Sequence, residues 1–334
     1  MNISSRDQSW QLAGLFTLSL RLVVGWTYFS AFWRRVVLEN KLNPDEAGYI
    51  GEKFNHFLPN ALGIKPMIEY LVTNPDSLHS AMVTFTLIEG IVGALLILGF
   101  FTRLMSIGVI SLAIGILLGS GWLGTTCLDE WQIGVLGISG GFTLFLTGSG
   151  YFSVDNYLLK RKRYSDAKLF SWIGSGHNTF LQCKSVILVV SIAIFGLTLY
   201  TNQYFHGGVF GTLHNMSVKP KIEISNASIN QDVLKFQIYR TEGGDVYGSF
   251  MIGIEFLDAS NNVVRSLSAQ DLAKFESENI SNHYIAKVKP GKYSLIVPLG
   301  AKADLSFKFS DDETSRIKSI KIIDISGIEW KHEI

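Results

Sequence analysis

The chain has 334 residues, of which 47% are hydrophobic and 17% charged, so it is more apolar than an ordinary soluble enzyme. Its formal net charge of +1 gives no field that would favour nucleic acid as a partner. The cysteines form no Cys-x-x-Cys ligand pair, and no glycine-rich dinucleotide fingerprint follows a strand pattern. The sequence therefore predicts no bound metal, flavin or nicotinamide.

Apolar stretches dominate the first part of the chain. A membrane-spanning helix needs about 20 apolar residues, and stretches that approach or reach this length cover residues 10–37, 81–101, 104–118, 131–146 and 186–200. A long polar and aromatic loop follows the first stretch, and a glycine-rich connector precedes the fourth. The sequence predicts a bundle of about five transmembrane helices, a four-helix core plus one, in a lipid bilayer.

A basic cluster predicts the orientation of these helices. Residues 160–163 read Lys-Arg-Lys-Arg, and such short basic loops stay on the cytoplasmic side. The N-terminus is then also cytoplasmic, whereas the loop over 38–79, the connector over 119–130 and everything after Tyr200 lie outside. Three polar segments that are distant in the sequence are thus predicted to share the outer membrane face.

The last third of the chain has a β pattern. Short alternating runs begin at Val233 and are separated by turn signals such as Pro290-Gly291, which is typical of an antiparallel β-sandwich. The expected fold class is an α+β membrane protein with an extracytoplasmic β-sandwich. The expected domains are a four-helix membrane domain over 1–160, a further helix and joint loop over 161–215, and the β-sandwich over 216–334.

Arg21 and Glu89 are charges deep within apolar stretches. Such charges are costly and are usually paired or functional. Counting residues from the predicted inner face places the two at nearly the same depth, so we predict a structural ion pair between the first two helices. The functional alternative is a proton path for quinone reduction.

The joint loop and the connector carry the candidate catalytic groups. Residues 204–215 hold His206 and His214 among glycines and aromatics, and imidazoles titrate near neutral pH. These histidines either bind an anion, shuttle protons or cap the loop, and their spacing defines no metal site. Cys127 lies near Glu130 in the connector, and a lone cysteine becomes reactive only beside a cationic partner.

Cations and tryptophans gather near the predicted outer face. An arginine fork donates paired hydrogen bonds to oxyanions, although snorkelling at a helix end explains each arginine singly. The candidate anion-binding cations are Arg34, Arg35, Lys65 and His56. Tryptophans near this interface either form an aromatic belt or contact a quinone headgroup. They are Trp26, Trp33, Trp122 and Trp131.

The motifs together resemble known families. The first half resembles the DoxX/DoxD membrane family, and the connector resembles its DoxD branch. The joint and the β region resemble DoxA. The segments that carry the resemblance are Leu20–Trp26, Ile88–Gly90, Leu98–Arg103, Gly121–Cys127, Asp129–Gln132 and Phe205–Asn215. DoxD-like and DoxA-like segments in one chain point to a fused thiosulfate:quinone oxidoreductase.

The resemblance implies that two thiosulfate ions are joined to tetrathionate and two electrons pass to a membrane quinone, the diffusible acceptor, in a prokaryotic cytoplasmic membrane. We expect a covalent role for Cys127, with His206, His214 or Glu130 handling the anions and protons. A homo-oligomer is left open. The rival hypotheses are a non-enzymatic DoxX-type membrane anchor or accessory subunit, and an oxyanion transporter.

Overall fold

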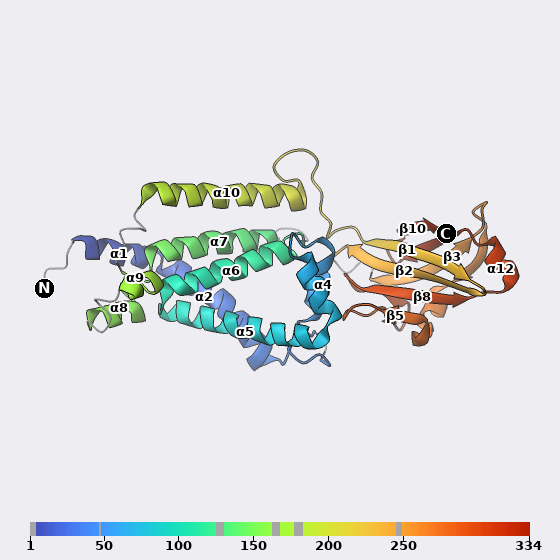
Figure 1. The fold of residues 1–334 in the computed structure, drawn as a ribbon, viewed down its shortest axis with the longest axis horizontal. Coiled ribbons are helices and arrows are strands. Elements are labelled where there is room, and N and C mark those ends of the chain that lie inside the picture. Colours follow the sequence, from blue (N-terminus) through green and yellow to red (C-terminus); the bar gives the residue numbers. More distant parts are fainter. Residues whose placement is uncertain (1–4, 47, 125–129, 162–167, 177–182, 245–248) are drawn as a thin grey trace. The chain divides into compact units, whose positions relative to one another are not determined.

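The computed structural model describes residues 5–334 except 47, 125–129, 162–167, 177–182 and 245–248 (Figure 1). The chain divides into two compact units, each assembled from segments that are separated in the sequence. Unit 1 comprises Met1–Tyr49, His79–Gly121 and Glu130–Thr212. Unit 2 comprises Ile50–Leu78, Trp122–Asp129 and Leu213–Ile334. The predicted division at residues 160 and 215 follows chain order and stays a prediction.

Unit 1 is helical. Its elements are α1 (Ser5–Phe16), α2 (Leu18–Phe32), the π-helical η1 (Trp33–Leu38), α5 (Pro75–Leu98), α6 (Thr102–Ser120), α7 (Glu130–Thr147), α8 (Val154–Lys160), α9 (Lys168–Ile173) and α10 (Lys184–His206). The first turn of α5 belongs to unit 2. Figure 1 shows α10 running alongside α7.

In the part of the chain that the structure describes, three helices are long and apolar enough to cross a membrane, namely α5, α6 and α10. A fourth span exists if Ser9–Phe16 and Leu18–Leu38, bent by 53° at Thr17, count as one. The predicted count of five spans stays a prediction, since α7, whose first turn carries Glu130 and Gln132, is not among the spans found in the described residues. The predicted class, an α+β membrane protein, is confirmed.

Small residues set the contact between α2 and α5. A Cβ built on Gly93 would lie 2.6 Å from the carbonyl oxygen of Gly25, so the two backbones can approach this closely only because neither residue has a side chain. Buried apolar residues such as Tyr28, Leu96 and Val109 form the core of this unit. The relative depth of groups on α2 and α5 is thereby fixed.

Unit 2 contains two antiparallel sheets. One has the order β1-β2-β8-β5, and the other β10-β9-β3-β7-β6, with β4 also paired to β3. The strands are β1 (Lys221–Asn230), β2 (Val233–Glu242), β3 (Phe250–Leu257), β4 (Val263–Leu267), β5 (Ile280–Asn282), β6 (Lys289–Pro290), β7 (Leu295–Ile296), β8 (Lys302–Lys308), β9 (Ser319–Asp324) and β10 (Glu329–Glu333). The helical pieces are α3 (Glu52–Phe57), η2 (Leu58–Asn60), α4 (Lys65–Thr73), α11 (Ala269–Ala273), η4 (Ser277–Asn279) and α12 (Asp311–Arg316).

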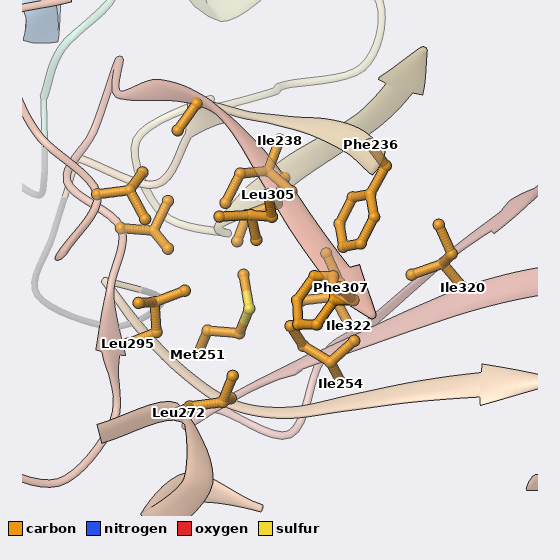
Figure 2. Packing of buried hydrophobic residues seen from close by; sticks show 14 of the residues in the cluster. Phe236, Ile238, Met251, Ile254, Leu272, Leu295, Leu305, Phe307, Ile320 and Ile322 are labelled. Atoms are coloured by element: carbon orange, nitrogen blue, oxygen red, sulfur yellow. The ribbon is translucent and has the colours of Figure 1, made fainter. Parts of the chain in front are cut away.

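The two sheets share one apolar core (Figure 2). Phe236 of β2 and Phe307 of β8 stack with ring centroids 5.5 Å apart, and Phe256 of β3 meets Phe307 edge-on at 5.2 Å. Each of these phenylalanines lies on the face of its strand that is turned toward this core, since successive side chains of a strand point to opposite faces.

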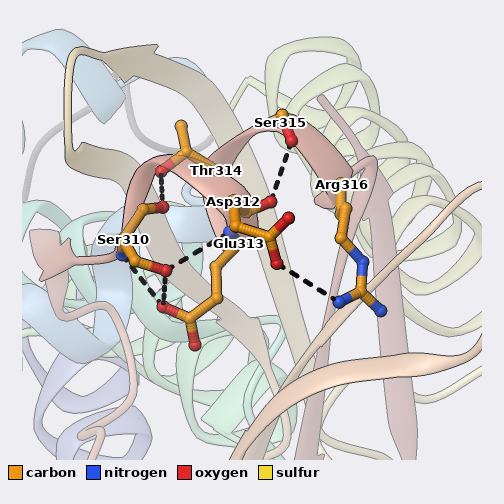
Figure 3. Close-up of polar contacts among 6 residues, drawn as sticks. All are labelled: Ser310, Asp312, Glu313, Thr314, Ser315 and Arg316. Atoms are coloured by element: carbon orange, nitrogen blue, oxygen red, sulfur yellow. Dashed lines mark hydrogen bonds and ion pairs between the residues drawn. The ribbon is translucent and has the colours of Figure 1, made fainter.

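A capping box begins α12 (Figure 3). The side chain of Ser310 accepts a hydrogen bond from the backbone N–H of Glu313, and the Glu313 carboxylate accepts one from the backbone N–H of Ser310 at 2.9 Å. This reciprocal arrangement satisfies donors that have no partner within the helix. It gives the turn between β8 and β9 a fixed start.

Residues 50–78, which connect the first two membrane helices, pack against the β part of unit 2. Leu58, Ile68 and Val72 are buried in one cluster with Tyr284. Polar bonds fix the same contact, since Asn60 Nδ2 donates to Thr241 O at 2.9 Å and Tyr284 Oη donates to Glu69 Oε1 at 2.7 Å. The connecting segment is therefore an integral part of the β unit rather than a free loop.

Candidate functional site

The intramembrane ion pair of unit 1 joins Arg35 and Glu89. Arg35 Nη1 donates a short hydrogen bond to the Glu89 carboxylate and a longer one, 3.5 Å, to Thr86 Oγ1. The Glu89 side chain is only 5% exposed and that of Arg35 is 19% exposed. A pair buried within apolar helices satisfies each charge by the other.

The predicted pair between Arg21 and Glu89 is wrong. Arg21 instead donates to two backbone carbonyls, Ser149 O at 2.6 Å and Phe152 O at 2.7 Å. Because the chain bends at Thr17, Arg21 lies in the first turn of α2, and its guanidinium is next to Gly99. Glu89 lies ten residues before Gly99, which is about 15 Å along a helix at 1.5 Å per residue.

His206 lies at the end of α10, where it is buried against Trp131 of α7. The two rings meet edge-on with centroids 6.3 Å apart. Trp131 Nε1 also donates to Thr201 Oγ1 at 2.8 Å, so two residues of α10 hold this tryptophan. Trp131 follows Glu130, the exposed first residue of α7. Trp131, which follows Glu130 directly, is therefore held in place by residues of α10.

The connector also forms hydrogen bonds with residues that follow His214. Asn215 Nδ2 donates to Gly124 O at 2.9 Å, and Gly124 N donates to Ser217 Oγ at 3.0 Å. Ser217 Oγ in turn donates to Trp122 O at 3.2 Å. We call these contacts the connector clamp. His214 itself is exposed in the structure.

Cys127 lies outside the described residues, so its surroundings are not part of the structure. Its segment, 125–129, starts directly after Gly124 of the connector clamp and ends directly before Glu130. Gly124 bonds to Asn215 and Ser217 of unit 2, and Trp131, the residue after Glu130, bonds to Thr201 of unit 1. The predicted catalytic role of Cys127 stays a prediction.

The tryptophans predicted to contact quinone have different environments. Trp26 and Trp33 are 56% and 40% exposed, and each ring contacts Phe29 at a centroid distance near 6 Å. The spacing of these three residues places them on one face of the helix. Trp122 is fully buried in unit 2 and donates from Nε1 to Phe57 O at 3.2 Å, so it is a packing residue and not a lipid-facing one.

The four predicted anion-binding cations are not equivalent. Arg35 is neutralised by Glu89, whereas Arg34 is exposed, with Nε donating to Ser30 O at 3.3 Å. Lys65 is exposed and donates from Nζ to Pro59 O at 3.1 Å. Burial, reinforced by Arg240 and Lys53, lowers the pKa of His56 to about 4. His56 is therefore neutral at pH 7, and its predicted role in anion binding stays a prediction.

Each unit also contains a buried charged residue that the sequence did not predict as important. Asp155 is fully buried and accepts from Phe101 N at 2.9 Å and Thr102 N at 3.1 Å, which caps the start of α6. Arg240 is buried among carbonyls of unit 2, and desolvation lowers its pKa to about 10 despite Asp324 nearby. Asp155 bonds to a segment more than 50 residues away, and Arg240 bonds both to nearby residues such as Gly243 and to the distant Val297.

The described residues hold no group of three or more His, Cys, Asp or Glu able to bind a metal ion. Among the polar groups that the helices of unit 1 bury are the Arg35–Glu89 pair and the Trp131–Thr201–His206 contact.

The fold and these buried polar groups define a membrane protein in which apolar helices are joined to an antiparallel β unit. Two family models match the chain, TQO small subunit DoxD over residues 16–190 and TQO small subunit DoxA over residues 205–333. The chain therefore belongs to the DoxD and DoxA families, the small subunits of thiosulfate:quinone oxidoreductase (TQO), here in one chain. The predicted resemblance is confirmed. No solved structure matches the chain.

Proposed function

We propose that this chain oxidises thiosulfate to tetrathionate at the outer membrane face and passes the electrons to a membrane quinone. Membership of both TQO families supports thiosulfate:quinone oxidoreduction in general. The connector clamp is the observation that carries the proposal further. It ties the DoxD connector, through Gly124, to Asn215 and Ser217 of the DoxA part. A residue of the DoxD part and residues of the DoxA part thus bond to each other at Gly124, shortly before Cys127 in the sequence.

The proposed reaction balances without a bound redox group. Two thiosulfate dianions form one sulfur–sulfur bond and release two electrons, giving tetrathionate. The quinone takes up these two electrons and two protons and becomes the quinol. Bringing two dianions together requires cations or hydrogen-bond donors that offset their repulsion, because low local dielectric strengthens it.

Cys127 is the proposed covalent carrier. Its thiolate and one thiosulfate lose two electrons to quinone and form a Cys–S–S–SO₃⁻ adduct. The second thiosulfate attacks the middle sulfur of this adduct, which lies between the cysteine sulfur and the sulfonate group. This attack forms the central bond of tetrathionate and releases the thiolate, as in thiol–disulfide exchange. Arg34, Lys65 and His214 are the proposed anion contacts, and His206 and Glu130 the proposed proton carriers.

The test uses the purified full chain in lipid nanodiscs with thiosulfate and a short-chain quinone. We expect tetrathionate and quinol in equal amounts, and we expect Cys127→Ser to abolish both. Cys183→Ser is the matched control, since Cys183 is exposed and free. Normal turnover by Cys127→Ser contradicts the covalent step. A folded wild type that produces neither product contradicts the proposed function and favours the anchor or transporter.

A further inference from the structure

We propose that the Arg35–Glu89 pair is the site where the quinone headgroup binds and is protonated. This inference rests on the proposed function, because it assumes that quinone is the acceptor. It assigns Arg35 to the quinone and not to thiosulfate, and it gives Glu89 the role of proton donor.

The charge balance of the pair selects a neutral ligand. Arg35 and Glu89 together carry no net charge, and the carboxylate repels any anion that approaches the guanidinium. A thiosulfate dianion would therefore lose most of the attraction that a lone arginine offers. A quinone is neutral, and each of its carbonyl oxygens accepts a hydrogen bond without bringing a charge into the bundle.

Arg35 retains donors for such a carbonyl. Of its three side-chain nitrogens, only Nη1 bonds to Glu89 and Thr86, and within the described residues Nε and Nη2 make no hydrogen bond. A guanidinium has five N–H donors in a planar fork. The fork can thus keep its bond to Glu89 while its remaining nitrogens donate to a quinone oxygen.

The position of the pair suits a ligand that arrives from the bilayer. Arg35 lies in η1, a π-helical segment that has no buried residue and continues α2. π-Helical turns are uncommon and occur frequently at functional sites. Glu89 lies in the apolar helix α5, which is long enough to span a membrane. A lipid-soluble quinone can approach the pair along these apolar helices from within the bilayer.

Aromatic residues border the pair on the same helix faces. Phe32 packs on Gly90, the residue after Glu89, where a side chain would overlap the phenyl ring. Tyr28 is buried one turn before Phe32 and lies within electrostatic reach of Glu89. Flat aromatic surfaces beside a charged donor and a carboxylic acid are the groups that a planar, two-carbonyl ring requires.

The chemistry assigned to the pair is one half of quinone reduction. Two electrons from thiosulfate enter the quinone ring while Arg35 donates to the carbonyl oxygen that gains negative charge. Glu89, a carboxylate in the resting pair, takes up a proton from solvent, gives it to that oxygen and returns to the carboxylate, and the second proton comes from water. The O–H bonds formed and the two electrons taken up account for the quinol.

The decisive experiment compares variants of the full chain in nanodiscs, with quinone and thiosulfate varied separately. We expect Arg35→Gln to raise the KM for quinone about tenfold and Glu89→Gln to lower kcat about 10–100-fold, while the KM for thiosulfate stays within about twofold of wild type. The controls are Arg161→Gln and Glu46→Gln, which alter exposed charges of unit 1. An unchanged quinone KM and kcat in both variants overturns the inference.

A second variant separates folding from function. Replacing both partners, Arg35→Met with Glu89→Leu, removes the pair without leaving a buried charge, and such apolar replacements are often tolerated. A photoreactive quinone is then cross-linked without thiosulfate and the adducts are mapped by mass spectrometry. We expect adducts on η1 and α5 in wild type and their loss in the folded double variant. Adducts on other helices, or adducts that persist in the double variant, refute the site. Absence of quinone reduction in wild type refutes the proposed function itself.

Discussion

Asn55 and Gly300 hold each other across unit 2, from opposite ends of the sequence. Asn55 Nδ2 donates to Gly300 O at 3.2 Å, and its Oδ1 accepts from Ala286 N at 3.1 Å. Gly300 has a φ of +73°, and a Cβ on this residue would overlap the carbonyl oxygen of Asn55. The contact between residues 50–78 and the β part therefore depends in part on the glycine at position 300 and the side-chain amide of Asn55.

Gly300→Ala is expected to destabilise unit 2 by about 3 kcal/mol or more, because backbone strain of about 1 kcal/mol adds to a steric overlap with backbone. The matched control is Gly327→Ala, which has a similar φ of +78° but open space around its Cβ. Thermal unfolding of the purified chain measures both. Equal unfolding midpoints for the two variants would show that the contact with Asn55 adds nothing.

Asp155→Asn is expected to destabilise unit 1 by about 2–4 kcal/mol, since the buried carboxylate accepts several hydrogen bonds and an amide group cannot accept them all. Asp76→Asn provides the comparison, because Asp76 is exposed in the first turn of α5. Detergent-resistant folded yield and the unfolding midpoint are the measurements. A yield for Asp155→Asn equal to that of Asp76→Asn would contradict the capping role.

Acidification is expected to weaken unit 2 through His56. Burial holds the pKa of His56 at about 4 in the folded chain, below the ordinary imidazole value of 6.5. Between these values the unfolded state binds the proton and the folded state does not, so stability is full above pH 6.5 and falls as the pH drops toward 4. We expect about 2 kcal/mol from this partly buried ring after allowing for solvent screening.

His56→Gln should remove this part of the pH dependence, and His79→Gln, a change at an exposed histidine of α5, serves as control. Unfolding midpoints of the full chain at several pH values between 4 and 7 provide the comparison. An identical pH profile for wild type and His56→Gln would mean that other groups cause the acid sensitivity.

The bond between Trp131 and Thr201 yields a double-mutant prediction. Thr201→Val leaves the indole N–H without its acceptor and should cost about 1–3 kcal/mol. Adding Trp131→Phe removes the orphaned donor, so the double variant should lose less than the sum of the single changes. Additive losses would indicate that the two residues act independently.

The sequence predicted the elements of this chain better than their contacts. Apolar length and alternation depend on neighbouring residues, and they correctly indicated α5, α6, α10 and the strands β2, β3, β4, β8 and β9. β1 was missed because residues such as Asn226 and Ser228 interrupt its alternation. The packing of residues 50–78 on the β part was also not foreseen, because it depends on partners more than 150 residues away.

The same holds for the candidate site, where the sequence predicted single residues better than the contacts between them. The sequence marked Glu89 as an unusual charge and Arg35 as a cation near the outer face, but it paired Glu89 with Arg21. Residue counting assumed one straight helix from Trp10, whereas the bend at Thr17 moves the start of the span to Leu18. A shift of the helix start changes the depth of every residue after it, and neither hydropathy nor charge specifies that bend.

The contacts between residues 50–78 and the β part have one further meaning. Residues 50–78 lie within the stretch that matches DoxD, whereas Thr241, Tyr284 and Gly300 lie within the stretch that matches DoxA. In a protein that carried these two parts on separate chains, the same apolar cluster and hydrogen bonds would form a subunit interface. Here the interface is built into one polypeptide, so its two halves are always made in equal number and never have to find each other by diffusion.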